Sequence, residues 1–358
     1  MNNPVADHLR RLIEIEGPVP VADYMAIALG HPQHGYYMRQ DPLGAGGDFI
    51  TAPEVSQMFG ELVGLWIAAQ WLAQGAPESF VLAEAGPGRG TLMADALRAT
   101  ARVPGFSRAA EVHFIETSPV LRAAQAVRVP HACWHDTLDS VPEGPLFLIA
   151  NEFFDALPVR QFVRTERGWC ERCVALDVTG ERFEPVLAPV AQGAADLLPP
   201  DLRDAPAGSL AEISPASEAI ARQIASRVAA HGGAALIIDY GHARSGLGDT
   251  LQAVRAHAYA DPFADPGLAD LTAHVDFEAL GQAAQAAGAT VHGPVEQGAL
   301  LFALGIESRC VKLKAGASQA QCDRINTELD RLTGADQMGH LFKAMAITPR
   351  NIPVPDGF

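Results

Sequence analysis

Three closely spaced glycines form the part of the sequence with the clearest chemical meaning. Residues 81 to 92 read VLAEAGPGRGTL, in which a strand-like apolar run leads into Gly86, Gly88 and Gly90 and then into a helical stretch. Glycines at such a turn allow a positive φ and let the backbone approach a ligand. The dinucleotide fingerprint G-x-G-x-x-G does not fit, because the third glycine arrives one residue early and Thr91 fills its place. A tight turn without a ligand is the alternative interpretation.

The order E-x-G-x-G-x-G, which begins at Glu84, resembles the first motif of class I S-adenosylmethionine-dependent methyltransferases. We therefore predict that Glu84 and the three glycines bind this cofactor. Glu116 ends the next apolar strand, where an acid can accept hydrogen bonds from ribose hydroxyls. That geometry also serves NAD enzymes, and a solvated acid at a strand end is the plainer alternative. Asp136 follows one unit later, where the methyltransferase pattern commonly places an acid near the adenine amino group.

A further polar segment, NEFFDALPV at residues 151 to 159, follows the next buried strand. It carries Asn151, Glu152 and Asp155 beside two phenylalanines. Carboxylates next to aromatic rings suit a cationic acceptor, because a guanidinium binds carboxylates in a planar fork and stacks on rings. We predict that Asn151 binds cofactor and that Glu152 and Asp155 are catalytic. A helix start with acids favoured by its dipole is the alternative.

A guanidinium acceptor also sets a chemical requirement, because its pKa exceeds about 12 and it stays protonated in water. Carboxylates must orient it and help a proton to depart. Glu212 and Asp239 are reserve candidates for this work. Cys170 and Cys173 have redox spacing but lie in a strand-like stretch, and the twelve histidines show no paired metal spacing, so no metal site is predicted.

The elements that must position these residues follow from hydrophobic periodicity. Short apolar runs that alternate with helical stretches predict a doubly wound, mainly parallel α/β sheet of the Rossmann-like methyltransferase type. We expect N-terminal helices and a cofactor-covering loop over 1–78, and the core over 79–310 with inserted strands and loop at about 159–210. A C-terminal helical segment and tail would occupy 311–358. Glycines and prolines make residues 35 to 54 an unusually long loop.

Composition limits the class of protein. The chain has 358 residues, of which 48% are hydrophobic, so a large core is expected and disorder is not. A net charge of −16 argues against nucleic acid or an anionic membrane as partner, and no apolar run is long enough for membrane insertion. Five scattered cysteines indicate reduced thiols. No targeting segment is recognised, so a cytoplasmic location is expected.

Taken together, these segments resemble the MidA family, whose animal members are mitochondrial assembly factors for respiratory complex I described as protein arginine methyltransferases. The resemblance extends from about residue 18 to 305 through the runs YMAIALGHPQHGYY, GDFITAPEVSQMFGELVG, EAGPGRGTL, NEFFDALPV, GGAALIIDYGH and ADLTAHVDF. Since no presequence is recognised, the sequence suggests a bacterial cytoplasmic relative.

The resemblance implies an S-adenosylmethionine-dependent enzyme that dimethylates, symmetrically, an arginine of the 49-kDa subunit of complex I. It also implies that Gly47, Asp48, Phe49 and Thr51 close over cofactor or acceptor, although a packed crossover is the alternative for that loop. Two other functions stay open: a non-catalytic complex I assembly factor that retains the fold, and a small-molecule methyltransferase. An NAD-linked oxidoreductase is a more distant alternative. The sequence leaves the oligomeric state open.

Overall fold

The centre of the molecule is a mixed β-sheet. The computed structural model describes residues 3–39, 51–189 and 193–358, and within them this sheet has eight strands. Its main path runs β15-β16-β10-β5-β2-β3-β4, and β14 pairs with β10 beside it. The strands from β10 to β4 are parallel to one another, whereas β16 is antiparallel to both of its neighbours. Their bounds are β2 (Phe80–Ala85), β3 (Ala110–Ile115), β4 (Cys133–His135), β5 (Leu146–Asn151), β10 (Gly233–His242), β14 (Val275–Asp276), β15 (Thr290–Glu296) and β16 (Phe342–Thr348).

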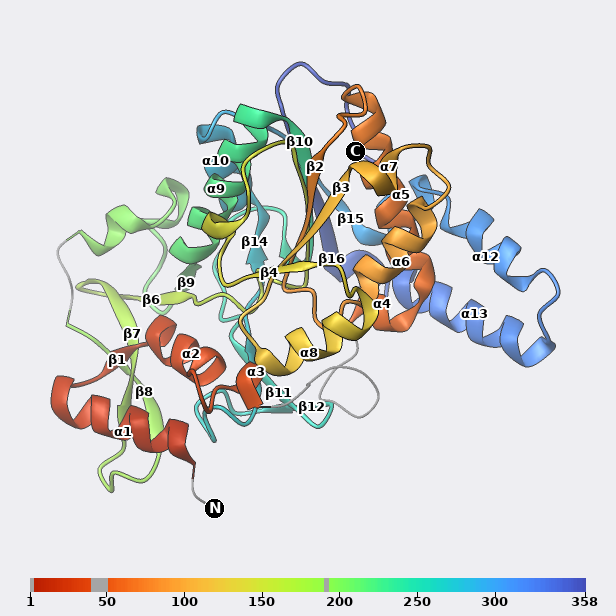
Figure 1. The fold of residues 1–358 in the computed structure, drawn as a ribbon. Coiled ribbons are helices and arrows are strands. Elements are labelled where there is room, and N and C mark those ends of the chain that lie inside the picture. The colour runs from red at the N-terminus through yellow and green to blue at the C-terminus, as the bar shows by residue number, and fades with distance from the viewer. Residues whose placement is uncertain (1–2, 40–50, 190–192) are drawn as a thin grey trace.

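Both faces of this sheet are buried, which explains why its parallel strands are continuous apolar runs. In β2, Phe80 and Leu82 belong to one hydrophobic core, whereas Val81 and Ala83 belong to another. The first core includes α5 (Gln57–Ala73) and α6 (Thr91–Thr100), and the second includes α9 (Pro215–His231) and α10 (Phe277–Ala286). Helices therefore flank the sheet on both sides (Figure 1), and the predicted α/β class is confirmed, with a mixed sheet.

Three helices begin at a side chain that caps the first turn. The hydroxyl of Ser118 accepts the backbone N–H of Leu121 at the start of α8 (Pro119–Arg128), and Ser214 plays the same part for α9. The carboxylate of Asp276 accepts from Ala279 at 3.0 Å and begins α10. Each cap satisfies a backbone donor that has no partner within its helix, so short local signals fix where these helices begin.

The predicted insertion forms a second sheet, which is antiparallel. The N-terminal segment joins it, because Val19 of β1 pairs with Val174 of β7. A third small sheet follows β10 in the chain. The strands of these two sheets are β1 (Val19–Pro20), β6 (Arg160–Thr165), β7 (Gly168–Leu176), β8 (Phe183–Leu187) and β9 (Leu210–Ile213), then β11 (Gln252–Arg255), β12 (Ala258–Ala260) and β13 (Asp270–Thr272).

The two ends of the chain do not form separate units. Helix α5 comes from the segment expected to hold only N-terminal helices and a loop, yet it packs in the central core. Strand β16 comes from the segment expected to be a helical segment and tail, yet it lies between β15 and β10. The central sheet and its core therefore include residues from outside the predicted core at 79–310, on both sides of it.

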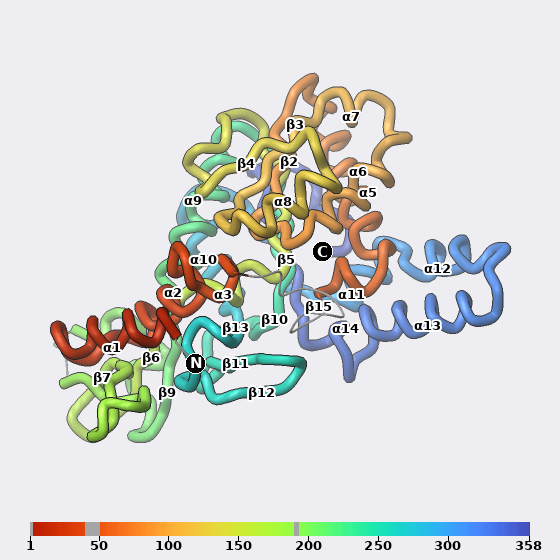
Figure 2. Tube along the Cα trace, turned by 60° about the horizontal axis from the view of Figure 1, so that its bottom comes forward, coloured from red at the N-terminus to blue at the C-terminus, as the bar shows by residue number. Residues whose placement is uncertain are grey.

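The remaining helices lie at the periphery. Figures 1 and 2 show α1 and α2 beside the second sheet at one end of the molecule, and the α12–α13 hairpin projecting at the other. The predicted long loop contains two short helices, α3 and α4, and its residues 40–50 lie outside the described residues. No helix of the described ranges is long and apolar enough to cross a membrane. These helices are α1 (Pro4–Glu16), α2 (Val21–Gly30), α3 (Tyr36–Arg39), α4 (Ala52–Val55), α7 (Phe106–Ala109), α11 (Gln297–Ala303), α12 (Ile306–Lys314), α13 (Gln319–Thr333) and α14 (Met338–Leu341), with short 3-10 turns at η1 (Leu138–Ser140), η2 (Ala194–Leu197) and η3 (Pro200–Leu202).

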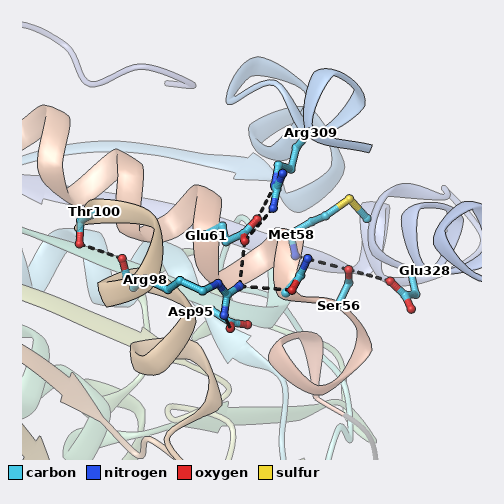
Figure 3. Close-up of polar contacts among 10 residues, drawn as sticks. Ser56, Met58, Glu61, Asp95, Arg98, Thr100, Arg309 and Glu328 are labelled. Atoms are coloured by element: carbon cyan, nitrogen blue, oxygen red, sulfur yellow. Dashed lines mark hydrogen bonds and ion pairs between the residues drawn. The ribbon is translucent and has the colours of Figure 1, made fainter. Parts of the chain in front are cut away.

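A buried carboxylate ties the projecting hairpin to the central body. Glu61 of α5 accepts hydrogen bonds from Arg98 of α6 at 2.8 Å and from Arg309 of α12 at 2.9 Å (Figure 3). Burial by itself raises the pKa of Glu61, but the two guanidinium groups outweigh it and hold the pKa below its usual value. One side chain thus joins three helices.

Replacing Glu61 with alanine is expected to lower the free energy of unfolding by about 1–3 kcal/mol, because two arginines lose a charged partner while remaining partly solvated. Urea denaturation at pH 7 measures this change. The exposed Glu78 is the matched control, and its replacement by alanine is expected to stay within about 0.5 kcal/mol. Since the pKa of Glu61 is lowered, its contribution is present above the usual carboxyl range and is lost as pH falls through it. Equal losses for both variants would contradict the assignment.

Candidate functional site

A cavity of about 810 Å³ lies where the carboxyl ends of the parallel strands meet. Its lining includes the glycine turn after β2, Glu116 after β3, Asp136 after β4 and the segment after β5. Ligands of open α/β sheets bind outside the carboxyl ends of the strands, in the crevice at the point where the strand order reverses. The sheet therefore brings together side chains that are far apart in the sequence.

The glycine turn has the backbone that its residue types predict. Gly86, Gly88 and Gly90 have φ of +62°, +52° and +79°, and Gly90 is the N-cap of α6. A Cβ added to Gly86 would lie 2.9 Å from Cδ2 of Phe153. Glycine is thus required at Gly86 for two reasons, the left-handed backbone and the close approach of an aromatic ring.

Glu84 lies at the base of this turn and is almost wholly buried. Burial raises the pKa of Glu84 to about 8, although the backbone N–H of Met93 opposes the shift. Its Oε2 has no hydrogen-bond partner among the described residues. A buried polar atom without a partner is available to a ligand.

Glu116 is joined to the glycine turn by a residue that the sequence analysis missed. Its Oε1 accepts the backbone N–H of Ser118 at 2.7 Å, and its Oε2 accepts Nε2 of Gln125 at 3.2 Å. The same Gln125 amide donates to the carbonyl of Gly88 at 2.7 Å. Burial raises the pKa of Glu116, which the hydrogen bonds partly offset. Each carboxylate oxygen keeps a lone pair for a further donor.

Asp136 occupies the outer edge of the cavity. Its carboxylate is largely exposed, and Oδ1 pairs with Nη2 of Arg122 at 2.7 Å. Arg122 itself belongs to α8, which begins shortly after Glu116. The cavity thus has a buried acid, Glu116, and an exposed acid, Asp136, at the ends of adjacent strands.

The segment after β5 is held in place by a buried acid from the neighbouring strand. Oδ2 of Asp239 accepts the backbone N–H groups of Phe153, Phe154 and Asp155 at 3.0–3.2 Å. Glu152 has a φ of +51°, unusual for a residue with a side chain, and its N–H donates to Ile238 of the same strand as Asp239. Asp239 therefore positions the loop, and it is not among the residues that line the cavity.

Glu152 and Asp155 both face the cavity and both have raised pKa values. Burial raises the pKa of Glu152 to about 7, partly offset by the N–H of Ala52, which donates to its Oε1 at 2.9 Å. Burial raises the pKa of Asp155 to about 6, partly offset by the hydroxyl of Tyr240. Oδ1 of Asp155 has no partner among the described residues.

The amide of Asn151 completes this acidic group. Its Nδ2 donates to Oε1 of Glu152 at 3.1 Å, whereas its buried Oδ1 has no partner within the described part of the chain. The second reserve acid, Glu212, lies elsewhere: its carboxylate accepts from Gln161 and Thr250 and does not line the cavity. The structure thus separates the four predicted acids into two in the cavity and two outside it.

Only one of the residues predicted for the covering loop belongs to the described part of the chain. Thr51 lines the cavity and is the N-cap of α4, whereas Gly47, Asp48 and Phe49 lie outside the described residues.

One side of the cavity was not anticipated from the sequence. Tyr37, Tyr240, Tyr259 and His274 line it, and the hydroxyl of Tyr37 donates to Asp270 at 2.7 Å. Burial raises the pKa of Tyr37 and Tyr240 and lowers that of His274, so all three are neutral near pH 7. Tyr240 ends the run ALIIDY, so the strand-end argument used for Glu116 could have found it. The other three depend on how the third sheet packs.

The lining has a strong excess of acid. Of the described residues, eight with carboxyl groups line the cavity, whereas Arg89 is the single arginine and no lysine is present. Within the described ranges, buried side-chain oxygens of Glu84, Asn151 and Asp155 have no hydrogen-bond partner and are available to a ligand. A ligand with hydroxyl and amino groups and a positive charge fits this set, as S-adenosylmethionine does.

Comparisons with known proteins agree with this chemistry. A family model described as "Putative S-adenosyl-L-methionine-dependent methyltransferase" matches residues 62–295. The chain is 39% identical to "Protein arginine methyltransferase NDUFAF7, mitochondrial" of Mus musculus, over 97% of this chain and 84% of that one. It is 37% identical to the Homo sapiens protein of the same name, over 97% and 84%.

A solved structure is similar over nearly its whole length. It is a "COG1565 superfamily member and likely methyl transferase from Burkholderia thailandensis bound to S-adenosyl-homocysteine", with a TM-score of 0.86 and 32% identity over 99% of this chain and 94% of that one. The predicted family resemblance and the predicted S-adenosylmethionine cofactor are confirmed by these comparisons.

The predicted location is corrected by the same relatives. The mouse and human proteins are both named as mitochondrial, and the corresponding Drosophila melanogaster protein is too. The expectation of a cytoplasmic protein is therefore wrong. It rested on failing to recognise a leader, and such an absence in a sequence does not establish a compartment.

Proposed function

We propose, from the premise that this chain belongs to the family of putative S-adenosyl-L-methionine-dependent methyltransferases, that it methylates the guanidinium group of an arginine in a protein. The observation that carries the proposal is a pair of carboxyl groups, those of Glu152 and Asp155, which line an acidic cavity that also has aromatic side chains, and whose pKa values are raised by burial. Phe153 lies between them in sequence and packs over Gly86. The names of the curated relatives support the same substrate class.

The cofactor would occupy the half of the cavity formed by the first three parallel strands. Glu84, Gly86, Gly88 and Gly90 would hold it at the turn, and Glu116, Asp136 and Asn151 would accept its hydroxyl and amino groups. When bound, S-adenosylmethionine supplies a methyl group on a positively charged sulfur, ready for a nitrogen nucleophile. Thr51, which lines the cavity, would cover it.

The chain's own acids would prepare the acceptor. A guanidinium delocalises its charge over three nitrogens, so a carboxylate on one nitrogen concentrates the charge away from the nitrogen that attacks. Asp155 Oδ1 is available for this contact because it has no other partner among the described residues. The proton that leaves the attacking nitrogen passes to a carboxylate, and the raised pKa of Glu152, about 7, suits a group that must accept it near neutral pH.

We further infer the identity of the acceptor as an arginine of a respiratory complex I subunit of the 49-kDa type, modified to symmetric dimethylarginine. The family resemblance supports this choice of subunit. The charge of −16 also suits a segment rich in arginine. We also infer that the sheet is doubly wound. The hydrophobic cores on both of its faces support this arrangement.

The direct test is methyl transfer in vitro. The purified full chain is incubated with S-adenosylmethionine labelled in the methyl group and with the 49-kDa-type subunit, and the products are read by mass spectrometry. Symmetric dimethylarginine at one site supports the proposal. S-adenosylhomocysteine binding without any transfer would favour a non-catalytic assembly factor instead, and label only in small molecules would favour a small-molecule methyltransferase.

The pH dependence of this activity is expected to follow the two acids. Only the ionised forms can hold the guanidinium and accept its proton, and their pKa values are about 6 and about 7. The value of kcat/KM is therefore expected to rise with pH over about 5 to 8 and then to level off. A Glu152→Gln variant would retain only the lower of the two inflections. A profile that falls with pH across this range would contradict the assignment.

A further inference from the structure

A single helical turn, α4, lies between the two halves of the cavity and contacts both. At its start, the backbone N–H of Ala52 donates to Oε1 of Glu152 at 2.9 Å. Two residues later, Glu54 accepts the hydroxyl of Thr91 at 2.5 Å and pairs with Arg89 at 3.6 Å. Thr91 and Arg89 flank Gly90 of the glycine turn. Within three residues, the helix therefore joins the cofactor half to the acceptor acids.

The end of α4 is fixed from outside. The hydroxyl of Ser56, which follows α4 directly, accepts the N–H of Met58 and so caps α5, and it donates to Oε2 of Glu328 on α13 at 2.8 Å. Figure 3 shows Ser56 pointing toward Glu328, with Glu61 held between Arg98 and Arg309 nearby. Because the residue after α4 is anchored in this way, we expect the contacts of Glu54 to determine the direction of the Ala52 N–H at the start of the helix.

The contacts of Glu54 are suited to this role. Its side chain is only 17% exposed, and its carboxylate accepts a hydrogen bond from Thr91 at the start of α6 and forms an ion pair with Arg89 of the glycine turn. A charge-assisted bond to a hydroxyl is short and directional, and it fixes α4 against the start of α6 more firmly than apolar contact would. Ala52, by contrast, can reach Glu152 only through its backbone, so its placement depends on the helix as a whole.

We propose that Glu54 is a positioning residue that clamps α4 to the glycine turn and thereby aims the Ala52 N–H at Glu152, coupling the cofactor half of the cavity to the acceptor half. The part of this inference that concerns Glu152 as a catalytic acid rests on the proposed function. The part that concerns the glycine turn does not, because it needs only that the cofactor binds there. Glu54 itself touches no reacting group in this scheme.

The test compares Glu54→Ala with a matched control. Glu171→Ala removes another carboxylate that pairs with an arginine, Arg160, and whose side chain is also 17% exposed, but on the second sheet away from the cavity. Two quantities are measured without turnover: the affinity for S-adenosylhomocysteine by calorimetry, and the titration of Glu152 by 13C NMR of the labelled carboxyl group. A Glu152→Gln spectrum assigns the resonance.

Glu54→Ala is expected to weaken S-adenosylhomocysteine binding about 5- to 50-fold, within the usual range of coupling between sites. It is also expected to move the titration midpoint of Glu152 upward, because loss of the Ala52 N–H leaves burial less opposed. Glu171→Ala is expected to change neither quantity. Thr91→Val is expected to give a similar loss of affinity. The double variant with Glu54→Ala is expected to lose less affinity than the product of the two single losses, since both substitutions remove the same hydrogen bond.

The outcomes separate the two ideas. If Glu54→Ala leaves both the affinity and the titration of Glu152 unchanged, this inference is overturned whatever the enzyme methylates. If the chain methylates no arginine but Glu54→Ala shifts both quantities, the proposed function fails and the clamp stands. Should Glu54→Ala prove unstable, Glu54→Gln retains an acceptor for Thr91 and loses only the charge, and an intermediate effect on both quantities is then expected.

Discussion

Replacing Asp155 with asparagine or Glu152 with glutamine is expected to lower kcat for methyl transfer by about 10²- to 10⁴-fold each, the usual range for a group that handles a proton in the transition state. Both changes keep the shape of the side chain. In the Glu152→Gln variant, the carbonyl oxygen of the new amide would still accept the N–H groups of Ala52 and Asn151, so the fold around it has no reason to change. What each variant loses is the negative charge that holds a guanidinium and receives its proton.

The measurement is a single-turnover rate at saturating cofactor, together with the affinity for S-adenosylhomocysteine. Because both acids are assigned to the acceptor, that affinity is expected to stay within a few fold of the wild-type value. Glu212→Gln serves as the matched control: Glu212 is also an acid whose pKa burial raises, but it lies outside the cavity. Full activity in both Glu152→Gln and Asp155→Asn would remove these residues from the catalytic assignment.

Gly86→Ala is expected to weaken the binding of S-adenosylhomocysteine by at least about 100-fold, or about 2.7 kcal/mol. The added Cβ would lie 2.9 Å from Cδ2 of Phe153, so the ring or the turn must move. Alanine also disfavours the left-handed backbone, with φ of +62°, by roughly 1–2 kcal/mol. Both costs act on the glycine turn that approaches the cofactor. Any movement that relieves the contact with Phe153 or the backbone strain would change the surface that the turn presents to the cofactor.

Gly75→Ala isolates the backbone cost from the site. Gly75 also has a left-handed backbone, with φ of +83°, but an added Cβ there would meet nothing within 4 Å, and it does not line the cavity. This variant is expected to lose stability in urea and to bind S-adenosylhomocysteine like the wild-type protein. Calorimetry on both variants gives the comparison, and equal affinities for Gly86→Ala and the wild type would rule out the glycine turn as the cofactor site.

Local patterns in the chain predicted the central sheet well. The apolar runs around β2 and β5 have strand length, and Ser118, Ser214 and Asp276, all of residue types that cap helices, begin helices in the structure. These signals are local, because burial on both faces or one hydrogen bond to a residue three positions away produces them. The boundaries at 78 and 310 had no such basis, and α5 and β16 crossed them to reach the core.

The candidate site likewise has features that the sequence predicted and features that only the packed structure decided. From residue type and order alone, the chain determined that a glycine turn, Glu116 and the acids after β5 meet at one edge, since parallel strands must end together. Only the tertiary structure decided which acids face the cavity. Asp239 turns its carboxylate to three backbone N–H groups, and Glu54 joins Thr91 across 37 residues. Strand periodicity fixes the face and the end at which a side chain lies, but its hydrogen-bond partner depends on distances between elements far apart in the sequence, and those exist only once the chain is packed.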